Sequence, residues 1–134
     1  MVINKNVIRE YPNQNYSVLF NKETGFMARV EKKGYSEPFW CEESPELLDI
    51  SITNYCEKGC SFCYRNSNID GQHMPFEDYL KIIKQIRELG VFQIALGGGN
   101  PNQHPDFIKI LQTTYNSGIV PSYTTNGLGL TDSI

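Results

Sequence analysis

The sequence predicts an α/β protein in which parallel βα units follow an N-terminal antiparallel hairpin. Two observations support this. In residues 1–46 two short apolar runs flank a turn, whereas from residue 47 apolar runs of strand length alternate with longer segments of helical periodicity. Strands that alternate with helices form parallel sheets, because each helix returns the chain to the same edge. We therefore expect an N-terminal extension over 1–46 and a core over 47–134.

The extension is predicted to be a β-hairpin. Residues 16–20 and 26–30 are apolar runs of strand length, and the turn between them begins at Asn21 and ends at Gly25. Asn and Gly are favoured where a hairpin reverses direction. The polar residues of the extension show no spacing typical of metal ligands or of an acid/base pair. We therefore expect it to extend or cap the sheet of the core.

The core begins with a strand over 47–53, whose alternating pattern places three apolar residues on one face: Leu48, Ile50 and Ile52. A helix is predicted over 76–89, because apolar residues recur there at spacings of three and four: Phe76, Leu80, Ile83 and Ile86. Gly90 follows directly, as the end of a helix prefers.

A second strand is predicted over 91–96, where nearly every residue is apolar, as in a strand buried on both faces. A helix should then run from Pro105 to Gly118, with an apolar face made by Phe107, Leu111 and Tyr115. The third strand is expected over 119–124. The helix that should follow it is absent from the sequence, so we expect a truncated array of about three βα units.

The chain has 134 residues, with 12 Lys and Arg against 15 Asp and Glu, and a net charge of −3. This balance excludes a basic nucleic-acid-binding surface. No apolar run approaches the roughly 18 residues of a membrane span, and the N-terminus has no signal-peptide pattern. We expect a cytoplasmic protein with neither nucleic acid nor membrane as a partner.

Three of the four cysteines, Cys56, Cys60 and Cys63, follow the first core strand within eight positions. At this spacing a short loop can bring three thiolates to an iron–sulfur cube. A cube has four irons, so three cysteines leave one iron without a protein ligand, and an open position is what a catalytic metal site requires. The end of a strand in a parallel sheet is also where such folds build active sites.

Two alternatives use the same cysteines. A structural zinc site could take Cys41 as its fourth ligand. The chain would then be a non-catalytic binding module, and such a module could also hold an iron–sulfur cluster instead of zinc. Zinc sites prefer two close pairs, however, and Cys41 lies fifteen residues upstream of Cys56 with no close partner. Redox chemistry at Cys60 and Cys63 would leave Cys56 without a role. We expect Cys41 to be an ordinary half-buried thiol.

Three motifs in order resemble the signature of radical SAM enzymes, from about residue 47 to residue 127. The cysteine motif carries an aromatic residue, Phe62, just before its last cysteine. A glycine-rich loop and a His-Pro-Asp-Phe segment come next, and a Thr-Asn-Gly segment follows the third strand. Their residues are Gly98-Gly99-Asn100-Pro101, His104-Pro105-Asp106-Phe107 and Thr125-Asn126-Gly127. Asn100 stands where the family usually has Glu.

This resemblance implies the first half of a partial (β/α)6 TIM-like barrel and a chemistry based on two cofactors. In the family, S-adenosylmethionine chelates the open iron of a 4Fe–4S cluster, and its reductive cleavage gives a 5′-deoxyadenosyl radical that abstracts hydrogen from a substrate. The resemblance implies that the three cysteines hold the cluster. It also implies an electron donor such as flavodoxin or ferredoxin, and a peptide or small-molecule substrate that the sequence does not identify.

Position by position, the resemblance places the backbone of Phe62 near the adenine of S-adenosylmethionine. The methionine amino group would be met by Gly98, Gly99 and Asn100, and Asn126 would face the same site. Tyr64 and Arg65 directly follow the last cysteine. They could shield the cluster or meet a carboxylate, or be ordinary solvated loop residues. We expect His73 and His104 to lie in a loop and at a helix entry without binding metal, and we assign no catalytic residue.

Overall fold

The computed structural model describes residues 5–11, 15–32 and 44–130. The chain forms two compact units, Met1–Ser44 and Pro45–Ile134, which we describe separately. No helix in the described part of the chain is both long enough and apolar enough to cross a membrane.

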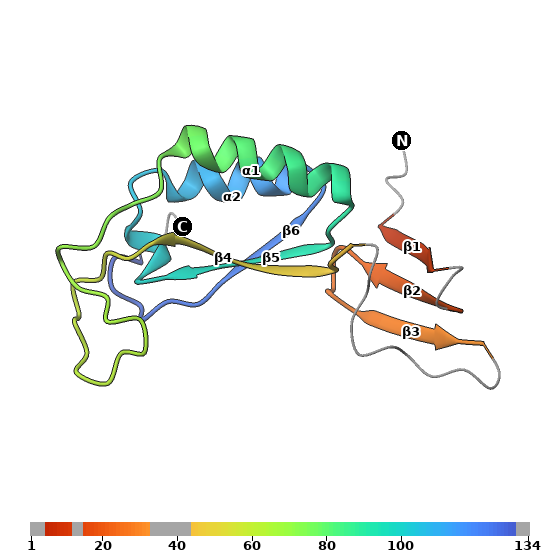
Figure 1. Ribbon diagram of the computed structural model, residues 1–134, viewed down its shortest axis with the longest axis horizontal. Coiled ribbons are helices and arrows are strands. Elements are labelled where there is room, and N and C mark those ends of the chain that lie inside the picture. The colour runs from red at the N-terminus through yellow and green to blue at the C-terminus, as the bar shows by residue number, and fades with distance from the viewer. Residues whose placement is uncertain (1–4, 12–14, 33–43, 131–134) are drawn as a thin grey trace. The chain divides into compact units, whose positions relative to one another are not determined.

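The first unit contains a three-stranded antiparallel sheet of order β1-β2-β3 (Figure 1). Its strands are β1 (Asn6–Tyr11), β2 (Tyr16–Asn21) and β3 (Met27–Glu31). The two runs expected to pair as a hairpin are β2 and β3, and Asn21 Oδ1 caps their turn by accepting from the Thr24 amide at 2.9 Å. The additional strand β1 was not predicted. The β-branched pair Val7-Ile8 and the Pro-Asn pair that follows Tyr11 were the signals that could have revealed it.

The second unit is a parallel sheet of order β4-β5-β6 with both helices on one of its faces (Figure 1). The strands are β4 (Leu47–Thr53), β5 (Gln93–Gly98) and β6 (Val120–Tyr123), and the helices are α1 (Phe76–Leu89) and α2 (Phe107–Asn116). A 3-10 turn, η1 (Pro101–Gln103), precedes α2. This arrangement confirms the predicted α/β fold with a parallel sheet.

The hydrophobic core lies between the helices and the covered face of the sheet. Strand β5 contributes Ile94 and Leu96, both fully buried, and β4 contributes Ile52. The alternate β5 residues Ala95 and Gly97 are only half-buried. The prediction that this strand is buried on both faces is therefore wrong, because helices cover only one face of the sheet. Within residues 45–130 no helix covers the opposite face.

In both helices the buried face is shifted by about one residue from the face that the apolar pattern predicted. Leu80 and Tyr115, expected on the buried faces, are 41% and 72% exposed. Tyr79 and Thr114, which the apolar pattern did not include, are buried instead. The two hydroxyls satisfy each other at 2.6 Å, so neither enters the core unpaired. Helix α2 also begins at Phe107 rather than Pro105, since Pro105 and Asp106 lie in a turn between η1 and the helix.

Candidate cofactor-binding site

Three loops meet at the edge of the sheet where its strands end. The cysteine loop follows β4, the glycine loop follows β5, and the segment 124–128 follows β6. Because parallel strands end at the same edge, motifs far apart in sequence become neighbours. The Asn100 amide donates to the Tyr55 carbonyl at 2.9 Å, and the Asn126 side-chain amide lies 3.5 Å from Cys56 Sγ. All three predicted motifs therefore share one site.

The cysteine loop is fixed at its base and exposed in its middle. The Cys56 amide donates to the Asn68 carbonyl at 3.0 Å, and the Met74 amide donates to the Ile52 carbonyl at 2.8 Å. By contrast, the side chains of Phe62 and Tyr64 are 88% and 93% exposed. Hydrogen bonds thus fix the two ends of the loop that carries the cysteines. These two aromatic side chains remain exposed.

The three cysteines in this loop are free thiols, with Cys56 buried and the other two half-buried. The backbone amides of Ser67 and Arg65 lower the pKa of the Cys63 thiol, against the opposing effect of burial, and the amide of Asn66 adds to the lowering. The Ser67 hydroxyl also favours the Cys63 thiolate; it is buried and has no partner in normal hydrogen-bond geometry among the described residues. A loop whose N–H and O–H groups favour a thiolate fits a cluster ligand, since the thiolate binds iron.

No group of three or more His, Cys, Asp and Glu side chains converges on a single point within the described residues. A structural zinc ion needs such convergence, because all four ligands lie about 2.0–2.3 Å from one ion. In an iron–sulfur cube each cysteine binds a different iron, so the three sulfurs need not converge. The donor set therefore suits a cluster better than a single ion. Cys41, the fourth ligand of the zinc alternative, lies outside the described residues.

The glycines of the second motif pack against the base of the cysteine loop. A Cβ atom at Gly98, where φ is +118°, would lie 1.8 Å from the Thr53 carbonyl oxygen, and one at Gly99 would lie 2.1 Å from that of Tyr55. The family resemblance places these glycines beside the methionine amino group. The structure adds a reason for glycine at both positions that needs no ligand, because the polypeptide backbone itself approaches them closely. At Gly97 a Cβ would meet nothing within 4 Å.

Asn100 is completely buried, and its side chain is bound to the segment that follows β6. Its Oδ1 accepts from Thr125 Oγ1 at 2.7 Å and from the Asn126 amide at 3.3 Å, while its Nδ2 donates to the Leu128 carbonyl at 3.1 Å. The family resemblance places Asn100 at the methionine amino group of the cofactor. In this structure the Asn100 side-chain oxygen is occupied by groups of the protein.

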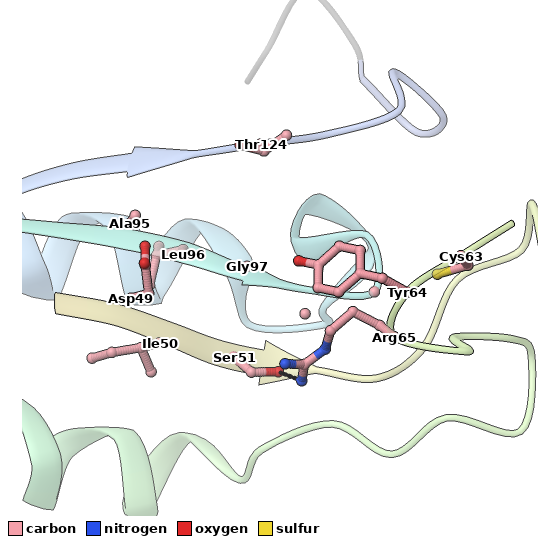
Figure 2. Close-up of a pocket in the computed structure, with 12 residues that line it drawn as sticks. Asp49, Ile50, Ser51, Cys63, Tyr64, Arg65, Ala95, Leu96, Gly97 and Thr124 are labelled. Carbon is pink, nitrogen blue, oxygen red and sulfur yellow. Dashed lines mark hydrogen bonds between the residues drawn. The ribbon is translucent and has the colours of Figure 1, made fainter.

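A cavity of about 600 Å³ opens on the uncovered face of the sheet next to Cys63 (Figure 2). Arg65 reaches over it, with Nη2 2.8 Å from Ser51 Oγ and 3.1 Å from Asn54 Oδ1. Sequence reasoning missed the lining residues that belong to the strands and the segment after β6: Asp49, Ser51, Ala95, Gly97 and Thr124. The signal that could have found Asp49 and Ser51 is alternation, since they lie opposite the apolar face of β4.

His73 and His104 do not line the cavity. As expected, His73 lies in the loop before α1 and His104 lies just before α2. His73 Nδ1 lies 2.8 Å from Thr53 Oγ1, and its ring contacts that of His104 edge-on. His104 Nδ1 accepts from the Asp106 amide, so Nε2 carries the proton and donates to the Met74 carbonyl at 2.8 Å. Burial, and next the electrostatic interaction with His104, lower the pKa of His73.

The model of the Radical SAM superfamily matches residues 50–134, which is more than half of the chain and includes all three loops. The chain belongs to the radical SAM superfamily. The cofactors of that superfamily are a 4Fe–4S cluster and S-adenosylmethionine.

Two curated radical SAM relatives illustrate the similarity. The chain is 32% identical over 84 residues to a probable GTP 3′,8-cyclase of Pyrococcus abyssi, covering 62% of this chain and 28% of the relative. It is 24% identical over 104 residues to a PqqA peptide cyclase of Ruegeria pomeroyi, covering 76% of this chain and 28% of the relative. The chain thus spans about a quarter of the length of these relatives.

The fold is similar to that of a solved radical SAM structure, Streptococcus suis SuiB bound to S-adenosylmethionine. The two superpose with a TM-score of 0.69 at 16% identity, covering 98% of this chain and 43% of SuiB. At this level of identity the likeness concerns the fold alone.

Proposed function

We propose that Pro45–Ile134 is the cluster- and cofactor-binding part of a radical SAM enzyme core, and that residues 1–44 extend it. The observation that supports this best is the meeting of three separate motifs at one sheet edge beside a cavity. When bound, the reduced cluster and S-adenosylmethionine supply a 5′-deoxyadenosyl radical, which abstracts hydrogen from the substrate. The parallel sheet of three strands would form the first half of a partial (β/α)6 barrel.

In this proposal Cys56, Cys60 and Cys63 hold the cluster. The hydrogen bonds that fix the base of their loop would keep the sulfurs in place, and the amides around Cys63 stabilise its thiolate. The exposed Phe62 would provide backbone and ring surface for the adenine. The Gly98–Asn100 backbone lies on the cavity wall or directly beside it, where it could meet the methionine amino group.

Arg65 would bind a carboxylate at the mouth of the cavity. Its guanidinium uses one nitrogen for Ser51 and Asn54, and a guanidinium has five N–H donors in all. The substrate of this chain would be a peptide or a small molecule; the former is suggested by the peptide cyclase relative. An electron donor such as flavodoxin or ferredoxin would reduce the cluster, and a reducing compartment such as the cytoplasm suits three free thiols.

The proposal predicts that replacing any one of the three clustered cysteines removes the iron–sulfur cluster. The Cys56→Ala, Cys60→Ala and Cys63→Ala variants should each lose most bound iron and sulfide after anaerobic reconstitution, because each would leave one iron without its ligand. Iron and sulfide analysis with the visible absorption spectrum measures this. Cys41→Ala is the matched control and should keep the full cluster. Equal loss in that variant, or stoichiometric zinc without an iron–sulfur spectrum in the unaltered protein, would contradict the proposal.

A further inference from the structure

We propose that Asn126 tunes the reduction potential of the cluster by donating a hydrogen bond to Cys56. Its side-chain Nδ2 lies 3.5 Å from Cys56 Sγ, a normal distance for a bond to sulfur, and Cys56 is the most buried of the three cysteines. Asn126 acts through a ligand of the cluster and is therefore a positioning residue. This inference rests on the proposed function, since it requires that Cys56 bind iron.

The orientation of the Asn126 amide is fixed by its own turn. Its Oδ1 accepts a hydrogen bond from the Leu128 amide at 2.9 Å, so the oxygen points away from the sulfur and the NH2 group points toward it. An oxygen cannot donate, and a carboxamide has only these two ends. The Leu128 amide thereby selects the end of Asn126 that faces Cys56.

The turn itself is held by Asn100 and Asn102. Asn100 Nδ2 and Asn102 Nδ2 both donate to the Leu128 carbonyl, at 3.1 and 2.6 Å. Asn100 Oδ1 accepts from the Asn126 amide at 3.3 Å, and the Thr125 hydroxyl, which has a single hydrogen, contacts both Asn100 Oδ1 and Asn102 Oδ1. The two asparagines therefore hold both ends of the turn that presents Asn126.

This network gives a physical reason for Asn100 where the family usually has Glu. Asn100 must donate to one carbonyl and accept from Asn126 and Thr125 at the same time, within a fully buried site. A carboxylate only accepts, so Glu at this position would leave the Leu128 carbonyl without one of its donors and bury a charge. Asn100 thus stabilises the turn that contains Asn126.

The effect on the potential follows from charge. One-electron reduction adds negative charge to the cluster and its thiolates, and an N–H dipole aimed at a sulfur stabilises that charge. Hydrogen bonds to the sulfurs are among the factors that set the potentials of iron–sulfur clusters. Asn126 therefore makes the cluster easier to reduce, and its loss should make reduction harder.

The test is a redox titration of the reconstituted full chain without S-adenosylmethionine, with dithionite as reductant and the reduced cluster followed by EPR. Asn126→Ala removes the donor without adding charge. Asn126→Asp removes the donor but keeps an oxygen for the Leu128 amide, so its turn is preserved. At a fixed applied potential, the ratio of reduced to oxidised cluster should fall about tenfold in Asn126→Ala, which is 59 mV for a one-electron couple. In Asn126→Asp it should fall further, because a negative charge faces the sulfur.

Asn100→Asp should shift the potential in the same direction and by less, since it loses the donor to Leu128 but keeps the acceptor for Asn126. Asn116→Asp, at the exposed end of α2, is the matched control for added charge and should leave the potential unchanged. Unchanged potentials in both Asn126 variants with normal iron content would overturn the inference and leave the proposed function intact. Loss of iron from both variants would also overturn it, because Asn126 would then hold the loop together. An unaltered protein that binds no cluster would instead refute the proposed function.

Discussion

At the scale of single residues, the glycine loop shows how the backbone constrains side chains beside the site. Gly98 combines a φ of +118° with a Thr53 carbonyl that would lie 1.8 Å from any Cβ. Gly97, its neighbour, has neither constraint and faces the cavity. The two adjacent glycines therefore differ in their surroundings. Gly98 packs against the backbone at the start of the cysteine loop, whereas Gly97 lies on the wall of the cavity.

Replacing Gly98 by alanine should destabilise the protein, whereas the same change at Gly97 should not. Gly98→Ala combines a strained backbone with a clash against a carbonyl that cannot move freely, which together cost about 2–4 kcal/mol. Gly97→Ala should stay within about 0.5 kcal/mol of the unaltered protein. Urea unfolding of the two variants, followed by circular dichroism, measures the difference. Equal stabilities would show that the β5–loop contact adjusts more easily than these distances imply.

At the scale of elements, α1 and α2 are joined by a buried polar contact within an apolar interface. Thr114 Oγ1 donates to the Ile110 carbonyl at 2.7 Å, so it must accept from the Tyr79 hydroxyl, which is 2.6 Å away. Both residues are completely buried. The contact lets a tyrosine and a threonine occupy core positions that the apolar pattern assigned to their neighbours.

Removing the Tyr79 hydroxyl and removing the Thr114 hydroxyl should lower the free energy of unfolding by different amounts. Tyr79→Phe should lower the free energy of unfolding by about 1 kcal/mol, because Thr114 keeps its bond to Ile110. Thr114→Val should cost about 1–3 kcal/mol, because it leaves a buried tyrosine hydroxyl without an acceptor. Tyr115→Phe, on the exposed side of α2, is the control and should change little. Thermal and urea unfolding of the three variants would reveal the order, and a smaller loss for Thr114→Val than for Tyr79→Phe would contradict it.

At the scale of the whole molecule, His73 couples stability to pH. Burial lowers the pKa of His73, and the electrostatic interaction with neighbouring His104 lowers it further. In the unfolded chain histidine titrates near 6.5, so below about that pH the unfolded chain binds a proton that the folded chain resists. The folded state is therefore fully favoured above pH 6.5 and loses stability as the pH falls through the lowered pKa.

We expect the melting temperature of the cluster-free chain to fall between about pH 7 and pH 5, with a smaller slope in His73→Gln. Carboxylates titrate near 4 and contribute little in this window. Calorimetry at several pH values gives the two slopes. Parallel curves for His73→Gln and the unaltered protein would mean that His73 is not the source of the pH dependence.

The sequence by itself determined most of the elements and the position of the cysteine loop between β4 and α1. Local periodicity predicted β4, α1, β5 and β6 to within a few residues, because apolar spacing reflects which side of each element is covered. Three close cysteines indicated a cluster because thiolate spacing is itself a local property. The turn at Asn21 was equally local. In each case the residues that carry the signal also form the structure.

Only the tertiary structure decided what depends on contacts between distant segments. Tyr79 and Thr114 became core residues because each found the other across two helices. One face of β5 stayed open because both helices lie on the other. The side chain of Asn100 binds the turn after β6, and this turn places Asn126 beside Cys56. Such pairings join residues more than twenty positions apart, and no local pattern encodes which donor will meet which acceptor.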